Sequence, residues 1–145
     1  MSVEESLRVF DEIEKAVNAR DWNRFDELHA ESVVDYSPQN PEGTKGIDAH
    51  RESMQNLFGA FPDARVEKTS AFGQGEWAVV ELTFAGTHTG PLMGPGGQEI
   101  PPTNKAAQLK VCSVNKVEGG KIAEEHTYFD QLTMLAQLGI TPEGD

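Results

Sequence analysis

The first part of the chain carries apolar side chains at the spacing of amphipathic helices. From Ser2 to about Leu28 they recur every three or four residues, with acidic and basic residues between them. A second stretch of this kind begins near Ile47 and reaches Phe61, where Pro62 prevents a helix from continuing. This pattern predicts two or three helices before Pro62.

A different pattern, typical of β-strands, occupies most of the remaining chain. A short apolar run at 33–36 leads into a loop, 37–46, that contains proline and glycine. Longer strand-like segments follow at 66–72, 77–88, 105–117 and 121–130. Glycine-containing turns separate the first from the second of these segments and the third from the fourth. A glycine- and proline-rich insert, 90–104, separates the second from the third, and we expect it to act as a lid.

Helices followed by a run of strands predict an α+β fold, in one domain over residues 1–145. The expected architecture is a curved antiparallel sheet wrapped over the N-terminal helices, which forms a cone with an internal pocket. Small-molecule sites favour such concave surfaces. On the strand 77–88, Val80, Leu82 and Phe84 share one face, and we expect this face to be the wall of the pocket.

The composition limits the partners of the protein. The chain has 24 acidic and 12 basic residues, so its net charge of −12 disfavours nucleic acids and anionic membranes. No apolar stretch approaches the roughly 20 residues of a membrane span, and the N-terminus does not resemble a signal sequence. We therefore expect a cytoplasmic protein. The single cysteine, Cys112, excludes an internal disulfide and is expected to be packed.

The segment 121–139 contains the strongest candidate for chemistry. It predicts a strand and then a short helix that ends at Gly139. Alternate residues of a strand share a face, and one face would carry Ile122, Glu124, His126, Tyr128 and Asp130. A carboxylate beside a histidine and aromatic rings is a plausible general acid or base. The opposite, outer face would carry Glu125 and Thr127 together with Val79 and Leu109 of other strands, a partly apolar surface that suits a homodimer.

Four short motifs give the chain a family resemblance. They are FPD at 61–63, GTHTG at 86–90, PTNK at 102–105, and GGKIxE followed by YFDQLxMLxQLG at 119–139. In this order and spacing they resemble SnoaL-like polyketide cyclases, which have the cone-shaped fold of the nuclear transport factor 2-like superfamily. The resemblance covers about residues 21–139. His126 stands where the family commonly has tryptophan, and Asn104 where PTGK has glycine.

The resemblance implies cofactor-free chemistry on a polyketide-like substrate. An aspartate at the position of Asp130 would be the acid/base of an intramolecular aldol closure. An apolar pocket that includes Tyr128 would raise the pKa of this carboxyl group toward working pH. His126 would orient a carbonyl or donate to a developing oxyanion. The alternatives are that Asp130 caps the following helix and that His126 is a half-buried structural residue.

Further side chains are candidates for substrate binding. His88 would lie near the pocket mouth or would stabilise a turn, and Gln108 would reach the pocket or face solvent. Strand alternation admits only one of Asp35 and Tyr36 inward, and we expect Tyr36, whose phenol can bond a substrate oxygen. The aromatic rings of Phe58 and Phe84 would supply apolar wall. The remaining histidines, His29 and His50, are expected at the surface.

The sequence favours an enzyme without a cofactor. The histidines lack the spacing of metal ligands on a helix or strand, and neither a phosphate-binding loop nor a nucleophile elbow is present. The expected ligand is a small hydrophobic carbonyl compound that undergoes acid/base-catalysed ring closure. The alternatives are a different cofactor-free isomerase or hydrolase, and a non-catalytic module that binds a small molecule or a partner.

Overall fold

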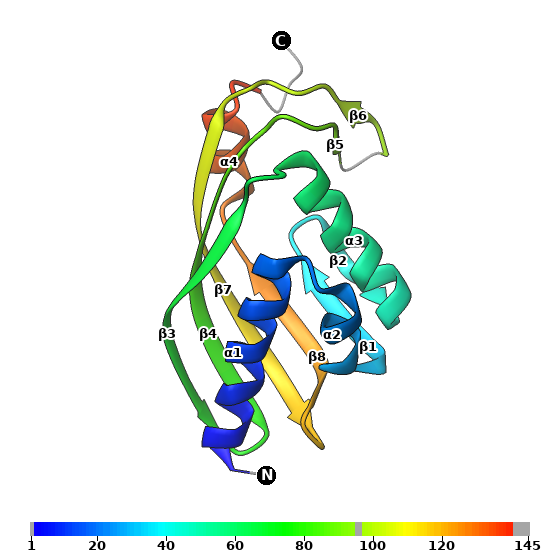
Figure 1. The fold of residues 1–145 in the computed structure, drawn as a ribbon, viewed down its shortest axis with the longest axis vertical. Coiled ribbons are helices and arrows are strands. Elements are labelled where there is room, and N and C mark those ends of the chain that lie inside the picture. The colour runs from blue at the N-terminus through cyan, green and yellow to red at the C-terminus, as the bar shows by residue number, and fades with distance from the viewer. Residues whose placement is uncertain (1, 95–96, 141–145) are drawn as a thin grey trace.

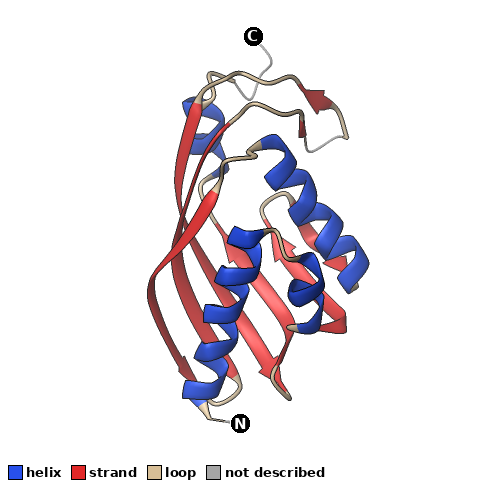
Figure 2. Cartoon of the chain, in the orientation of Figure 1, coloured by secondary structure: helices blue, strands red, loops and turns tan. Residues whose placement is uncertain are grey.

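Three helices lie against one face of a curved sheet in the computed structural model, which describes residues 2–94 and 97–140 (Figure 1). They are α1 (Val3–Ala19), α2 (Trp22–Glu27) and α3 (Ile47–Ala60). A fourth helix, α4 (Gln131–Gln137), follows the last strand near one end of the sheet. The α+β fold class is confirmed, and Figure 2 shows that α1, α2 and α3 lie on the same side of the strands.

The sheet has six strands in the order β2-β1-β8-β7-β4-β3. Their bounds are β1 (His29–Ser37), β2 (Asn40–Lys45), β3 (Arg65–Gln74), β4 (Trp77–Thr87), β7 (Ala106–Glu118) and β8 (Lys121–Tyr128). Neighbouring strands in this sheet are antiparallel except for β1 and β8, which run parallel. The expectation of an antiparallel sheet therefore holds for most of it.

Two segments that the sequence indicated as loops contain strands. Residues 40–45 form β2, which pairs antiparallel with β1 although this segment contains proline and glycine. The insert contains a short hairpin of β5 (Leu92–Met93) and β6 (Glu99–Ile100). Leu92 is buried in the same apolar cluster as Phe58 and Phe84, so this hairpin packs onto the core. At the end of the insert, Asn104 has φ 60°, a left-handed conformation that glycine or asparagine adopts most readily.

A β-bulge in β8 changes which side chains face the helices. Lys116 of β7 pairs with Glu124, but its neighbour Val117 pairs with Ile122, so Ala123 is an extra residue in the strand. Ile122 is fully buried, and the next inward side chain beyond the bulge is Glu125. The alternation predicted from the sequence, which placed Glu125 on the outer face, is therefore wrong beyond Ala123.

The helices close over the sheet through two apolar clusters. One is centred on aromatic rings, with Phe58 against Phe84 at 5.9 Å between centroids and Phe61 against Phe84 at 5.4 Å. The other joins α1 to the middle of the sheet and includes the fully buried Val33 and Ile122. Burial of such side chains contributes about 1.5–3 kcal/mol each. In the part of the chain that the structure describes, no helix is long and apolar enough to cross a membrane.

Candidate active site

A cavity of about 200 Å³ lies between the helices and the concave face of the sheet. Its wall is mostly apolar and includes Phe10, Val17, Met54, Leu57, Phe58, Val80, Leu82, Phe84, Leu109, Val111, Phe129 and Met134. The strand face predicted to form the wall, Val80, Leu82 and Phe84, therefore does so. The concave fold and its pocket agree with the expectation from the sequence.

Polar side chains from three elements meet at this cavity. Asp35 comes from β1, His50 from the first turn of α3, and Glu125 and Thr127 from β8. The His50 Nε2 atom is 3.0 Å from Glu125 Oε2, and its Nδ1 atom is 3.8 Å from Asp35 Oδ2. Thr127 donates its hydroxyl hydrogen to Asp35 Oδ1 at 3.1 Å. One imidazole thus lies between two carboxylates, and its contact with Glu125 is an ion pair more than a well-aligned hydrogen bond.

The register of the strands brings the two carboxylates together. Asp35 and Glu125 are directly paired across β1 and β8, and both line the cavity. Burial of Asp35, reinforced by the negative charge of Glu125, raises the pKa of Asp35 to about 7. The charge of His50 and the Thr127 hydrogen bond act in the opposite direction. Asp35 can therefore both accept and donate a proton near neutral pH.

The charges of His50 and Glu125 stabilise each other. Burial alone would lower the pKa of His50, but its contact with Glu125 and the charge of Asp35 raise the pKa above the ordinary value. Burial would raise the pKa of Glu125, and the His50 contact outweighs this effect and lowers it. These shifts favour the charged forms of His50 and Glu125, while Asp35, with its pKa near 7, is present in both states at neutral pH.

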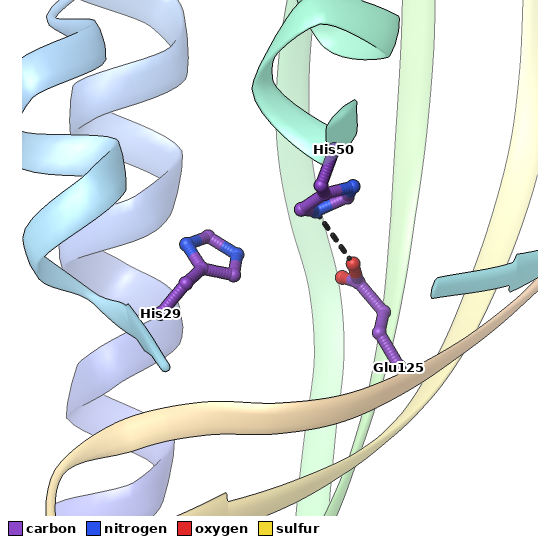
Figure 3. A group of neighbouring side chains, drawn as sticks. All are labelled: His29, His50 and Glu125. Carbon is purple, nitrogen blue, oxygen red and sulfur yellow. Dashed lines mark ion pairs between the residues drawn. The ribbon is translucent and has the colours of Figure 1, made fainter. Parts of the chain in front are cut away.

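His29 extends this cluster toward α2. Its Nδ1 atom lies 2.7 Å from the carbonyl oxygen of Phe25, and because a carbonyl only accepts, Nδ1 carries the hydrogen. Burial lowers the pKa of His29, which favours the neutral ring. Figure 3 shows the ring beside His50 and Glu125, and the ring centroids of the two histidines are 5.1 Å apart.

The cluster also has the composition of a cation site. Atoms of His29, His50 and Glu125 that could bind a metal ion lie within 4.8 Å of one another. The sequence argument against a metal site considered only spacing along the chain, so it did not test this group. Two of these groups already contact each other, because His50 Nε2 lies 3.0 Å from Glu125 Oε2. We therefore interpret the cluster as a proton-transfer site.

The structure places Asp130 outside the cavity. Its carboxylate is solvent-exposed and caps α4, accepting hydrogen bonds from the Thr133 backbone at 3.1 Å and the Thr133 hydroxyl at 2.8 Å. These bonds lower the pKa of Asp130, so the expectation of a raised pKa is wrong. Tyr128 is 58% exposed and forms no pocket around it. The alternative prediction, a helix cap, describes this aspartate.

His126 and Tyr36 lie on the outer face of the sheet. Their rings stack at 4.8 Å with an angle of 13° between the planes, and His126 Nε2 is 2.7 Å from Glu124 Oε1. Val33 faces the core, so strand alternation directs Asp35 inward and Tyr36 outward. The expectation that Tyr36 and His126 face the pocket is therefore wrong.

The other predicted residues differ in where they lie. His88 is fully buried, with its Nδ1 atom accepting from the Thr103 backbone at 3.2 Å, and it fixes the start of the insert without lining the cavity. Gln108 is exposed, and its backbone exchanges hydrogen bonds with the Gln137 side chain. Phe58 and Phe84 do lie in the cavity wall. Their contact with a substrate remains a prediction.

The sequence argument missed the residues that meet at the cavity. His29 and His50 were expected at the surface because charged residues surround them in sequence, yet they are 2% and 3% exposed. Their apolar neighbours at helical spacing, Phe25 and Met54, gave a signal for burial. Asp35 was detectable as the alternation partner of Val33. Glu125 carried no such signal, because the bulge at Ala123 reverses its orientation.

Comparisons with known proteins agree with this fold. A family model described as SnoaL-like polyketide cyclase matches residues 7–138. IdmH of Streptomyces antibioticus, a candidate polyketide cyclase, is 25% identical with a TM-score of 0.76, covering 93% of this chain and 99% of IdmH. AclR of Streptomyces galilaeus, a candidate hydroxylase, is 22% identical with a TM-score of 0.81, covering 95% of this chain and 98% of AclR.

A candidate ketosteroid isomerase from Kribbella flavida is also similar in structure. It is 19% identical with a TM-score of 0.66, and the match covers 89% of this chain and 80% of that protein. No curated protein sequence matches the chain significantly. At these identities the solved structures agree on the fold, while the proteins are named as a hydroxylase, a cyclase and an isomerase.

Proposed function

Because the chain belongs to the SnoaL-like polyketide cyclase family, whose model matches residues 7–138, we propose that it closes a ring in a carbonyl substrate by acid/base catalysis. Asp35 is the acid/base in this proposal. The observation that carries it is the position of Asp35, at an apolar cavity beside Glu125 and His50, with its pKa raised to about 7.

The proposed reaction begins with removal of a proton from carbon. The ionised carboxylate of Asp35 takes a hydrogen from the carbon next to a substrate carbonyl, and the electrons of that C–H bond form an enolate. Negative charge then gathers on the carbonyl oxygen and needs a hydrogen-bond donor. Ser113 lines the cavity, and its Oγ accepts from Asn115 at 2.9 Å, which leaves its own hydroxyl hydrogen free to donate.

Ring closure returns the proton. The enolate carbon attacks a second carbonyl of the same molecule, a C–C bond forms, and the second oxygen becomes an alkoxide. Protonated Asp35 donates its hydrogen to that alkoxide, which restores the carboxylate for another cycle. His50 and Glu125 act as positioning residues, since they fix the charge state of Asp35 without touching the reacting carbon.

The test distinguishes between Asp35 and Asp130 as the catalytic base. β-Tetralone, a ketone with acidic hydrogens, is incubated with the protein in D₂O, and deuterium incorporation next to its carbonyl is followed by NMR. We expect Asp35→Asn to slow the exchange by roughly 100-fold or more, the usual contribution of a general base. Asp130→Asn should exchange like the wild type. The reverse result would return the role of base to Asp130.

Two controls complete this experiment. Ligand binding by Asp35→Asn, measured separately, should persist, which shows that the cavity is intact. Exchange should also survive dialysis against a chelator, because no step passes through a metal ion. If the wild type binds β-tetralone but catalyses no exchange, the protein is a small-molecule-binding module and the proposed activity is wrong.

We also propose that the protein forms a homodimer through the outer face of the sheet. Large apolar side chains are exposed there, with Phe72 58% exposed and Trp77 38% exposed. Glu125, Thr127 and Leu109, which the sequence placed on this face, point to the cavity instead. The outer face therefore carries more aromatic rings than the sequence predicted, and Glu124 takes the place of Glu125 on it.

A further inference from the structure

We propose that the substrate is an uncharged carbonyl compound of one or two rings, smaller than the multi-ring compounds that the word polyketide suggests. This inference rests on the proposed function, because it assumes that the reacting carbonyl lies at Asp35. Two independent features of the cavity carry it, its volume and the sign of the charges in its wall.

The volume limits the number of rings. An apolar cavity of about 150 Å³ accommodates benzene, and pockets for drug-sized ligands start at about 300 Å³. The cavity here, at about 200 Å³, lies between these values and nearer the first. One six-membered ring with its substituents fits, and a second fused ring fills the space.

Interlocked aromatic rings oppose an expansion of this cavity. Phe58 packs edge-to-face against Phe84 at 5.9 Å and against Trp22 at 6.1 Å, and Trp22 in turn packs against Phe25 at 5.5 Å. These contacts join α2, α3 and β4, so a larger ligand would have to separate three elements at once. Leu57 lies next to Phe58 in the chain and lines the cavity but is only partly buried. It is therefore a wall residue whose truncation enlarges the space without removing a core ring.

The charges of the wall exclude an anionic substrate. Asp35, Glu125 and Glu14 all line the cavity, and the ionised form of Asp35, which begins the proposed reaction, would repel a carboxylate ligand. The cation that lines it is Lys68, and its ammonium group is paired with Asp11. Protonated His50 is held between Asp35 and Glu125. The described part of the wall therefore offers no unpaired positive group, and a neutral ligand is favoured.

Methionine methyl groups provide a direct readout of where a ligand binds. Met54 and Met134 line the cavity, whereas Met93 is 48% exposed on the insert. With ¹³C-methyl methionine in the full-length protein, ligand in the cavity should shift the first two signals and leave the Met93 signal in place. The probes are phenylacetone with one ring, β-tetralone with two and anthrone with three. Phenylacetate is the charged counterpart of phenylacetone.

We expect phenylacetone and β-tetralone to shift the Met54 and Met134 signals, with anthrone and phenylacetate binding at least tenfold more weakly. Leu57→Ala should strengthen anthrone binding at least tenfold. Leu132→Ala, at a position 63% exposed and outside the cavity wall, is the matched control and should leave the order of the ligand affinities unchanged. The wild-type series tests the inference even where the Leu57 variant is unstable.

Anthrone binding as tightly as β-tetralone, phenylacetate binding as tightly as phenylacetone, or no binding by either small ketone would overturn the inference. The failure of the proposed function looks different. If the small ketones bind in the cavity and no deuterium exchange follows, the size and charge preference holds and the catalytic role of Asp35 is lost. If β-tetralone exchanges its hydrogens and anthrone binds as tightly as β-tetralone, the catalytic role stands and the size limit is wrong.

Discussion

Asp35 and Glu125 are paired residue to residue across the parallel strands β1 and β8, with both carboxylates at the same cavity. Two negative charges so close cannot both be fully ionised at low cost in a dry site. The imidazole of His50 stabilises the charge of Glu125, so Asp35 is the acid that keeps its proton until the pH approaches 7. Glu125 is therefore the fixed charge of the pair, and Asp35 is the group that titrates.

The Glu125→Gln variant should lower the pKa of Asp35 below its wild-type value of about 7, because the neighbouring negative charge is gone. A ¹³C-carboxyl NMR titration of both proteins measures the change. Glu124→Gln is the matched control, since Glu124 lies next in the chain, on the outer face, in contact with His126. An unchanged Asp35 pKa in Glu125→Gln would mean that burial alone sets it.

Asp35 should make the wild type less stable as pH rises. Its pKa is about 7 in the folded protein and near 3.8 when unfolded, so the folded state binds the proton more tightly. The contribution is complete below about pH 4 and is lost as pH rises through 7. Asp35→Asn lacks this titration, so urea denaturation at several pH values should show the variant gaining roughly 2–4 kcal/mol relative to wild type between pH 4 and 8. A pH-independent difference would contradict the raised pKa.

Removal of the His50 imidazole should leave the buried charge of Glu125 without its ion-pair partner. In His50→Gln, Glu125 loses its ion pair in a buried site, a change that typically costs about 3–5 kcal/mol. The double variant His50→Gln/Glu125→Gln removes both charges and should be more stable than the sum of the single effects predicts. Denaturant unfolding of the four proteins measures the coupling. Additive effects would show that the 3.0 Å contact contributes little.

Asp130, the exposed aspartate at the start of α4, should contribute to stability and not to proton transfer. Asp130→Ala removes both hydrogen bonds to Thr133 and should lower the midpoint of thermal unfolding, whereas asparagine, also a favoured cap, should preserve it. Differential scanning calorimetry of the two variants tests this. Equal midpoints for alanine and asparagine would mean that the cap does not stabilise α4.

Self-association should depend on the outer aromatic face. Trp77→Arg places a charge on this surface and should shift the protein from dimer to monomer in sedimentation velocity at micromolar concentration. Leu132→Arg, at a more exposed position located on α4, should remain dimeric. A monomeric wild type would refute the proposed dimer.

The sequence predicted the fold well and the site poorly, for a physical reason. Periodicity reports which residues are apolar, and this was enough to place Val80, Leu82 and Phe84 in the cavity wall. Charged residues at a cavity interrupt that periodicity, so the sequence pattern indicated surface positions for Asp35 and His50. The family motif at the C-terminus directed attention to Asp130, whose carboxylate caps α4 in this protein.

The extra residue in β8 has a consequence for comparing members of the family. Some relatives would lack the extra residue that this chain has at Ala123. A residue-by-residue alignment of the strand with such a relative pairs an inward side chain in one protein with an outward side chain in the other. Residues in the same alignment column are then displaced by one position along the strand in space. Before the role of a residue on this strand is transferred to a relative, the bulge has to be located in both proteins. Residues are then matched by whether their side chains face the cavity.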